Sequence, residues 1–321
     1  MQLQPKDPGA LRPPVLRDRK PGPIAAPASA RVASTDTSRD LVLTLACPDR
    51  PGIVYSVSGF LARHGFNIVE SDQFGDREAG VFFMRVRFAP AEDDVPNVGQ
   101  LRDAFDQVAD MFSMTWHMVE VSTKPRVLLM VSKFGHCLND LLYRAASGAL
   151  HVQIVGVVSN HPDLSSMVAP YRIPFFHVPV TAETKPVAEA KLLEIVANLD
   201  VDLVVLARYM QILSEDLCKE LEGRAINIHH SMLPSFKGAR PYHQAYDRGV
   251  KLVGATAHYV TSDLDEGPII AQAVAQVDHA MTAEEVTAVG RDNECLALAR
   301  AVRWHCESRV LLHGHRTVVF A

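Results

Sequence analysis

The sequence predicts an α/β protein in which a small βαββαβ module, of ferredoxin-like order, precedes a doubly wound domain with a mostly parallel sheet. The chain has 321 residues, which at roughly 150 residues per domain indicates about two domains. Residues 41–121 follow the order strand, helix, strand, strand, helix, strand. From residue 126 nearly to the end, apolar strand-like runs alternate with helical patterns.

The first module begins after a proline-rich stretch. Residues 1–39 contain seven of the 20 prolines and no periodic apolar pattern that would offset the entropy of ordering the chain. We therefore expect a disordered extension over 1–39, and its prolines oppose the amphipathic helix of a transit peptide. The module then occupies 40–122 and the larger domain 123–321. Within the module we expect strands at 41–47, 67–74, 81–89 and 114–121, a helix from Ile53 that ends at Gly65, and a helix at 101–109.

The larger domain is expected to contain a sheet and two well-defined helices. A helix over Pro186–Leu199 places its apolar residues on one face, and the Thr282 and Glu285 pair has the pattern of a capping box for a long helix to about Cys306. Residues 309–320 predict a hairpin around Gly314. Strands are expected at 126–132, 152–159, 175–180, 202–207, 225–229, 253–260 and 269–277.

Composition and charge argue against several classes of function. The formal net charge of -5 argues against a nucleic-acid-binding surface. No apolar run approaches the ~20 residues of a membrane-spanning helix, and no secretory signal follows Met1. The five cysteines are scattered, which argues against disulfides and a cysteine-based zinc site, and the 14 histidines lack the spacing of a metal pair. We therefore expect a cytoplasmic protein with no metal, no nucleic-acid partner and no membrane association.

Polar residues follow the apolar run that ends in Ile226. Asn227 and His229 are two apart, so on an extended strand both side chains project from the same face, and an amide and an imidazole then converge on one carbonyl group. A second polar cluster, Asp263 to Pro268, interrupts two apolar strands. Taken singly, the first pattern also fits a loop cap and the second a solvated turn.

Together these segments resemble the catalytic domain of the formyltransferases that use 10-formyltetrahydrofolate. The family pattern NIHxSxLPxxxG matches residues 227–238, LDxGP matches 264–268, and the folate-pocket pattern LAxxMxILS matches 206–214. The resemblance covers roughly residues 126–310. It implies a catalytic triad of Asn227, His229 and Asp265, weaker substrate-contact candidates in His230, His243 and His258, and a folate site formed by Met210, Gln211, Ile212, Leu213, Val260, Thr261 and Asp263.

The residue types of this triad suit formyl transfer. Attack on the N10-formyl carbon creates an oxyanion, to which Asn227 and His229 can donate hydrogen bonds worth ~3 to 4 kcal/mol per donor. Asp265 would orient or charge His229 and hold an attacking water.

The first module resembles an ACT domain. The resemblance implies a small amino-acid effector, with methionine and glycine as candidates, and pairing of the modules in a homo-oligomer. Gly52 permits a tight turn into a helix N-terminus, whose free N–H groups suit a carboxylate. A purely oligomerising module is the alternative. The implied effector residues are Asp49, Arg50, Gly52, Ile53, Asn67 and Ile68.

An ACT-like module ahead of a formyltransferase-like domain resembles the formyltetrahydrofolate deformylase family. That resemblance implies hydrolysis of 10-formyltetrahydrofolate to formate and tetrahydrofolate, feeding one-carbon and purine metabolism, with no cofactor besides the folate substrate. The first alternative is a formyltransferase acting on an amine such as glycinamide ribonucleotide. The second, a non-catalytic amino-acid sensor, is disfavoured because all three catalytic residue types are present.

The loop after residue 131 helps to distinguish a hydrolase, whose acceptor is water, from a transferase, whose acceptor is an amine. Ribonucleotide formyltransferases resemble one another there in a GxGSN turn, whose N–H groups hold the substrate phosphate. This chain instead has one glycine, Gly135, between the bulky Phe134 and His136. The loop therefore favours water as the acceptor, although Lys133 and His136 leave open an anion bound in another way.

Overall fold

The computed structural model describes residues 39–91, 95–233 and 241–321. The disordered extension predicted for 1–39 lies outside these residues, apart from Arg39. Pro234 and Gly238 of the first family pattern also lie outside them.

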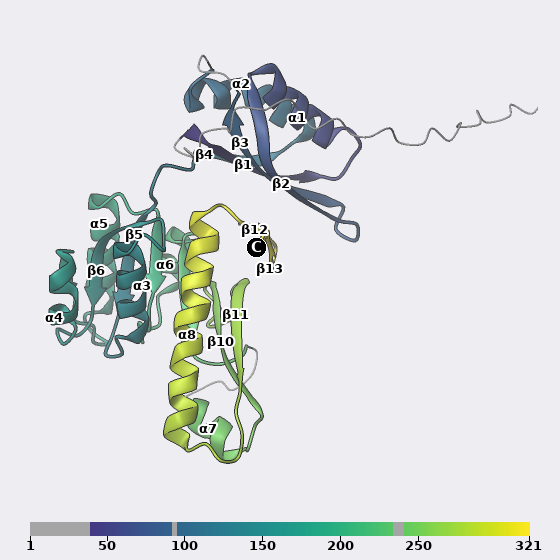
Figure 1. Cartoon of the computed structure of the whole chain (residues 1–321). Coiled ribbons are helices and arrows are strands. Elements are labelled where there is room, and N and C mark those ends of the chain that lie inside the picture. The colour runs from purple at the N-terminus through teal and green to yellow at the C-terminus, as the bar shows by residue number, and fades with distance from the viewer. Residues whose placement is uncertain (1–38, 92–94, 234–240) are drawn as a thin grey trace, which may run out of the picture. The chain divides into compact units, whose positions relative to one another are not determined.

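The first module is a βαββαβ unit, as predicted, with two helices packed on a four-stranded antiparallel sheet of order β2-β3-β1-β4 (Figure 1). Side chains of both helices share one apolar core with the strands. The second helix begins three residues before the predicted start because Asn97 and Gln100 form a capping box. The elements are β1 (Leu41–Pro48), α1 (Ile53–Arg63), β2 (Phe66–Asp76), β3 (Val81–Pro90), α2 (Val98–Phe112) and β4 (Thr115–Glu120).

The larger domain contains a seven-stranded sheet of order β11-β10-β9-β8-β5-β6-β7. The five strands from β9 to β7 are parallel, and β10 runs antiparallel to both of its neighbours, which confirms the mostly parallel fold. The strands are β5 (Arg126–Val131), β6 (Gln153–Ser159), β7 (Phe175–His177), β8 (Leu203–Leu206), β9 (Ala225–His229), β10 (Leu252–Tyr259) and β11 (Ile269–Gln276). The helices are α3 (His136–Ala146), α4 (Ser165–Val168), α5 (Lys185–Asn198), α6 (Glu215–Glu220), α7 (Pro241–Asp247) and α8 (Ala283–Cys306), with a short 3-10 turn at Ala169–Tyr171.

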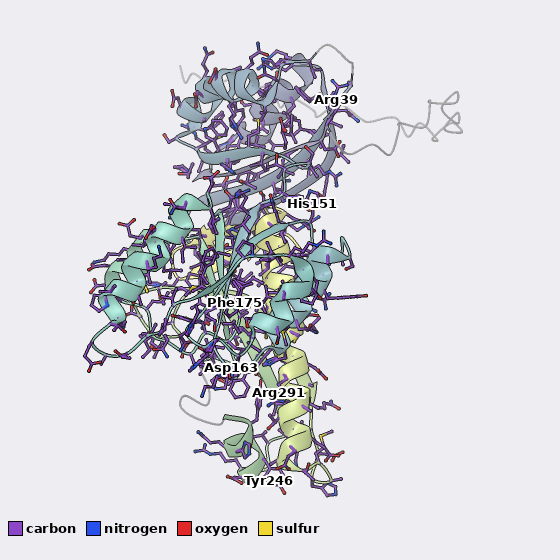
Figure 2. All side chains as sticks on the ribbon, turned by 90° about the vertical axis from the view of Figure 1, so that its left-hand side faces the viewer. Arg39, His151, Asp163, Phe175, Tyr246 and Arg291 are labelled. Atoms are coloured by element: carbon purple, nitrogen blue, oxygen red, sulfur yellow. The ribbon has the colours of Figure 1, made fainter. Side chains whose placement is uncertain are left out.

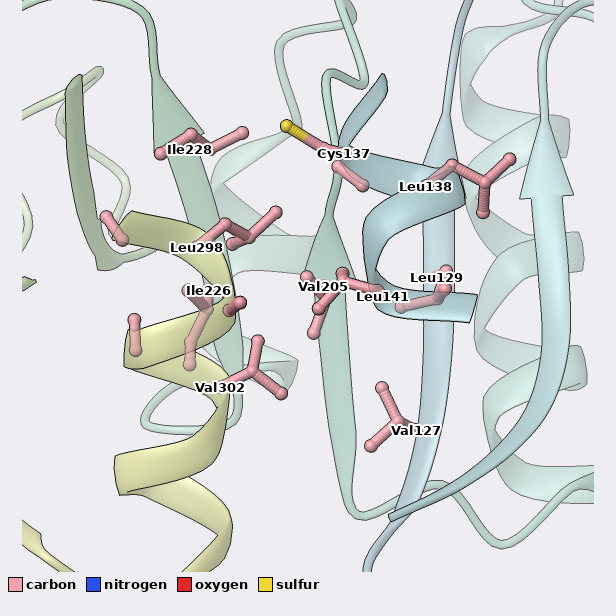
Figure 3. Close-up of a cluster of buried hydrophobic side chains, with 14 of the residues drawn as sticks. Val127, Leu129, Cys137, Leu138, Leu141, Val205, Ile226, Ile228, Leu298 and Val302 are labelled. Atoms are coloured by element: carbon pink, nitrogen blue, oxygen red, sulfur yellow. The ribbon is translucent and has the colours of Figure 1, made fainter. Parts of the chain in front are cut away.

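Alternating side chains divide this sheet into two buried faces. Val127 and Leu129 of β5 pack with α3 and α8, whereas Leu128 and Met130 pack with α5 and α6. Figure 3 shows the first face, where Cys137 and Leu141 of α3 and Leu298 and Val302 of α8 approach the strands. Helices therefore cover both faces of the parallel part, as a doubly wound sheet requires.

The strand β7 is shorter than predicted. Residues 175–180 were expected to form a strand, but pairing stops at His177. β7 is an edge strand that pairs only with β6, and Pro179 has no N–H group to donate to a ladder.

The C-terminal part follows the predicted pattern closely. Thr282 and Glu285 form the capping box that starts α8, and β12 (Val310–His313) pairs with β13 (Arg316–Val319) around Gly314, which has a φ of 60°. The hairpin is tied to the main sheet where the Thr317 hydroxyl donates to the Ile269 carbonyl at 2.6 Å. None of the helices in the described part of the chain combines the length and apolar character that a membrane crossing requires.

Replacing Leu298 by alanine tests whether α8 holds this domain together. Leu298 is fully buried against the sheet, so Leu298→Ala is expected to lower the free energy of unfolding by about 2 to 5 kcal/mol. Leu296 on the same helix is 45% exposed, and Leu296→Ala serves as the matched control in urea denaturation. Equal effects of the two substitutions would contradict the packing described for α8.

Candidate active site

The candidate site lies where the chain changes direction within the large sheet. From β5 the chain proceeds to β6 and β7, then returns to add β8 on the other side of β5. Ligands of open α/β sheets bind at such a switch point, outside the carboxyl ends of the strands. Ser132, just after β5, joins the ends of three strands there: its hydroxyl donates to Asn160 Oδ1 at 2.7 Å and accepts from the Met210 N–H at 3.0 Å.

Asn227 is held by the strand next to it. His258 of β10 lies directly opposite Asn227 of β9, and Asn227 Nδ2 lies 3.2 Å from His258 Nε2. His258 Nδ1 lies 2.8 Å from the Tyr259 carbonyl oxygen, which only accepts, so Nδ1 carries the proton. Burial lowers the pKa of His258 and favours its neutral form, whose Nε2 accepts from Asn227. The amide of Asn227 is thereby oriented by His258.

His229 is oriented by Asp265. His229 Nδ1 lies 3.1 Å from Asp265 Oδ2, so Nδ1 donates to the carboxylate, and Nε2 is buried with no hydrogen-bond partner among the described residues. Burial raises the pKa of Asp265, but the hydrogen bond from His229 and the neighbouring imidazoles outweigh burial and lower it. A charged carboxylate thus holds one ring nitrogen of His229 and leaves the other for a substrate.

The loop that carries Asp265 is pressed against β10. A Cβ atom at Gly267 would lie 1.8 Å from the Tyr259 carbonyl oxygen, so only glycine fits there. The Tyr259 N–H donates to the Pro268 carbonyl at 2.9 Å. Asp265 itself has a φ of 59°, a left-handed conformation that Asp tolerates better than most residues. These constraints bring the Asp265 carboxylate to His229.

The two segments assigned to the folate approach the same part of the domain. Tyr209, Leu213 and Val260 pack against one apolar cluster, formed by β5, β6 and β8 together with α5 and α6. Met210 and Ile212 expose apolar side chains, with 52% and 61% of each accessible. Exposed apolar groups on the segment that follows β8 are accessible to a flat aromatic ligand. Gln211 is half-buried, the Thr261 hydroxyl donates to the Asp263 carbonyl at 3.1 Å, and the Asp263 side chain is exposed.

The three weaker histidine candidates differ in their distance from the proposed catalytic residues. His258 touches Asn227, as described above. The ring of His230 lies 5.1 Å from that of His229, and burial lowers its pKa to about 4, so it is neutral near pH 7. His243 on α7 is exposed, and no described contact joins it to the Asn227, His229 and Asp265 set.

A buried carboxylate near this site was missed by the sequence analysis. Glu294 of α8 is 1% exposed and lies next to His136, Arg208 and Tyr242. Its position could have been found from the helical period, because Val286, Gly290, Glu294, Ala297 and Ala301 form one buried stripe. A charged residue in the middle of such a stripe requires buried partners.

The effector residues predicted in the first module do not all come together. A surface cavity of about 530 Å³ is lined by Asp49, Arg50, Gly52 and Ile53, together with Pro51, Val54, Tyr55 and Phe82. Gly52, which has a φ of 98°, lines this cavity directly before the start of α1. Asn67 is exposed, Ile68 packs on the module core, and neither lines the cavity.

Comparisons with known families match two separate parts of the chain. A model of the ACT domain matches residues 41–106, and a model of the formyl transferase family matches residues 125–302. The chain is 58% identical over 279 residues to a formyltetrahydrofolate deformylase of Corynebacterium sp., a match that covers 87% of this chain and 97% of the relative.

Solved structures give the same picture. A formyltetrahydrofolate deformylase from Burkholderia mallei is 51% identical, with a TM-score of 0.85 over 88% of this chain and all of that one. A glycinamide ribonucleotide transformylase from Symbiobacterium toebii is 29% identical, with a TM-score of 0.59 over 62% of this chain and 95% of that one. The deformylase thus matches both domains, and the transformylase a smaller share of the chain.

Proposed function

The chain belongs to the formyltetrahydrofolate deformylase family, whose members are hydrolases, and we propose that its Asn227, His229 and Asp265 hydrolyse 10-formyltetrahydrofolate to formate and tetrahydrofolate. One observation carries the assignment of these residues. The Asp265 carboxylate binds His229 Nδ1 while His229 Nε2 is buried without a partner, beside an amide whose orientation is set by His258.

The proposed reaction is an addition followed by an elimination. The oxygen of a water molecule bonds to the formyl carbon, and its proton passes to His229 Nε2 while Nδ1 stays hydrogen-bonded to the Asp265 carboxylate. The carbonyl oxygen becomes an oxyanion, which accepts hydrogen bonds from Asn227 and His229. Collapse of this intermediate breaks the bond between the formyl carbon and N10, and N10 takes up the proton from His229 Nε2, which returns the imidazole to its neutral form. No oxidation state changes, so the proposed reaction needs no redox cofactor.

Water is the proposed acceptor because of the loop after β5. The side chains of this loop are directed to protein partners: His136 binds Glu294 at 2.8 Å, and the Phe134 ring lies beneath the guanidinium groups of Arg208 and Arg291, the latter labelled on α8 in Figure 2. A cradle for a phosphate requires bare backbone N–H groups at this place. The bulky Phe134 and His136 side chains, which contact Arg208, Arg291 and Glu294 at the start of α3, take the place of a glycine-rich turn and favour hydrolysis over transfer to glycinamide ribonucleotide.

A formate-release assay tests the reaction. With 10-formyltetrahydrofolate and no added amine, we expect the full chain to release one formate per tetrahydrofolate formed. Formate is measured by a coupled dehydrogenase and tetrahydrofolate by its absorbance. Faster formylation of added glycinamide ribonucleotide than release of formate would instead support the transferase.

Substitution of the proposed triad should lower turnover far more than binding. Asn227→Ala, His229→Ala and Asp265→Asn are each expected to lower kcat by about a hundredfold or more, because each removes a group that acts on the transition state. Affinity for a non-hydrolysable folate analogue, measured by fluorescence, should change little. An Asp265→Asn enzyme with near-normal kcat would show that the assignment is wrong.

We further propose that the ACT domain binds a small amino acid, methionine or glycine, and that the chain forms homo-oligomers through this domain. The Asp49 carboxylate at the cavity suits the ammonium group of the amino acid, and the N-terminus of α1 suits its carboxylate.

We also propose that the enzyme serves one-carbon and purine metabolism, because its products are formate and tetrahydrofolate. A cytoplasmic location is supported by the five free cysteines, since disulfides are rare in reducing compartments.

An amino-acid titration of the full chain tests the proposed regulation. Methionine or glycine is expected to change the rate of formate release, and Asp49→Asn should raise the concentration needed by about tenfold or more, as expected when a hydrogen bond to a charged group is lost. Asp103→Asn, at an exposed position on α2, is the matched control. If neither amino acid alters activity or oligomeric state, the regulatory proposal fails.

A further inference from the structure

The segment between β8 and α6 carries four of the proposed folate contacts but forms no helix or strand. It comprises residues 207–214 and includes the run from Met210 to Leu213. Within the part of the chain that the structure describes, the backbone of residues 209–213 makes no hydrogen bond to another backbone group. The conformation of this segment is therefore set by contacts with side chains from the elements around it.

Ser132, directly after β5, holds the first half of the segment. Its hydroxyl donates to Asn160 Oδ1 at 2.7 Å, which leaves a lone pair of the same oxygen to accept from the Met210 N–H at 3.0 Å. Ser132 and Asn160 are both buried, and the Ser132 N–H donates to the Arg208 carbonyl at 3.2 Å. These contacts bridge the ends of β5 and β8, where the strand order reverses and where ligands of open α/β sheets bind.

Glu189 of α5 holds the other end of the segment. Glu189 Oε1 accepts from the Ser214 N–H at 2.8 Å, and the Glu189 side chain is only 16% exposed. Lys185, one helical turn earlier, places its Nζ 4.0 Å from the same carboxylate oxygen. The Ser214 hydroxyl in turn accepts from the Leu217 N–H at 3.2 Å and caps α6. Glu189 therefore fixes the point at which the segment enters α6.

Between these two ends the side chains of the segment have two environments. Tyr209 and Leu213 pack on the apolar cluster of α5, α6 and the strands, whereas Met210 and Ile212 are more than half exposed. The segment and α5 together line one pocket, to which α5 contributes Ala188, Glu189 and Leu192 and the segment contributes Tyr209, Gln211 and Leu213. The exposed apolar groups are thus presented to solvent by a backbone that is fixed on both sides of them.

We propose that Ser132 and Glu189 are positioning residues for substrate binding, because they hold the two ends of residues 207–214 in the conformation that takes the folate. This inference rests on the proposed function, since the segment binds a folate only if 10-formyltetrahydrofolate is the substrate. A binding loop that is ordered beforehand loses less entropy when its ligand binds. No described hydrogen bond or ion pair joins either side chain to the proposed catalytic residues. Loss of either contact therefore weakens substrate binding and leaves the chemical step nearly unchanged.

A role in stability alone leads to a different result. If Ser132 and Glu189 only stabilise the fold, their loss reduces the fraction of folded enzyme. The maximal rate then falls in proportion to that fraction, but the KM of the remaining folded enzyme stays the same. The split between KM and kcat therefore separates positioning of the substrate from stability of the fold.

Steady-state kinetics of the full chain test this inference. Ser132→Ala and Glu189→Ala are expected to raise the KM for 10-formyltetrahydrofolate at least about fivefold, as the loss of one hydrogen bond allows, with kcat within about twofold. The Kd of a non-hydrolysable folate analogue, measured by fluorescence, should rise by the same factor. Glu189→Gln keeps an oxygen that can accept from the Ser214 N–H and should therefore rescue both KM and Kd.

The matched control lies on the same helix. Glu194 of α5 is 55% exposed and pairs with Lys191 at the surface, so Glu194→Ala should leave KM and Kd unchanged. If Glu189→Ala does not fold by circular dichroism, Glu189→Asp replaces it, because the shorter side chain withdraws the carboxylate from Ser214 and should also raise KM.

Two results would overturn the inference. One is an unchanged KM and Kd in the folded Ser132 and Glu189 variants. The other is an equal rise of KM in Glu189→Gln and Glu189→Ala, because the hydrogen bond to Ser214 would then not be the cause. Failure of the unaltered chain to release formate overturns the proposed function instead.

Discussion

The contact between His229 and Asp265 joins two segments that belong to different parts of the sheet. His229 ends β9, whereas Asp265 lies in the turn between β10 and β11. The two meet because Gly267 lets that turn press against the Tyr259 carbonyl, where any Cβ atom would collide. The neighbouring pair, Asn227 and His258, follows from the same register, since these residues lie opposite each other in β9 and β10. The antiparallel pairing of β10 therefore sets the geometry of all three proposed catalytic groups.

The strand β10 also supports the segment that leaves His229. Thr256, which is fully buried, accepts hydrogen bonds from the Leu233 N–H and the Gln272 amide and donates to the Ser231 carbonyl. Its partner in β9 is His229. A hydroxyl with three partners at this position leaves the following backbone little freedom, so His230 is held between His229 and Tyr242.

The helix α8 contributes both stability and chemistry. Its apolar residues Leu298 and Val302 pack on the sheet, and one helical turn before Leu298 the same buried stripe carries Glu294. A carboxylate at that depth is compatible with folding only because three separate segments supply partners for it. Folding of the sheet and assembly of the region beside His229 are thus coupled through one helix.

The order of the strands and helices, the two-domain fold class and the capping box at Thr282 could be predicted from the sequence, because these features depend on local periodicity and on neighbouring residues. Asn227, His229 and Asp265 could be selected because they lie in short recognisable segments, and the structure brings their side chains into one set of contacts. Other features depended on contacts between distant residues. The neutral tautomer of His258, the displacement of Asn67 and Ile68 from the cavity in the first domain, and the partners of Glu294 all required the tertiary structure. Sequence periodicity indicates which face of a helix or strand is buried. It does not indicate which side chain from a distant part of the chain contacts a polar residue on that face. That contact decides whether the buried polar residue has a structural role or a role in the reaction.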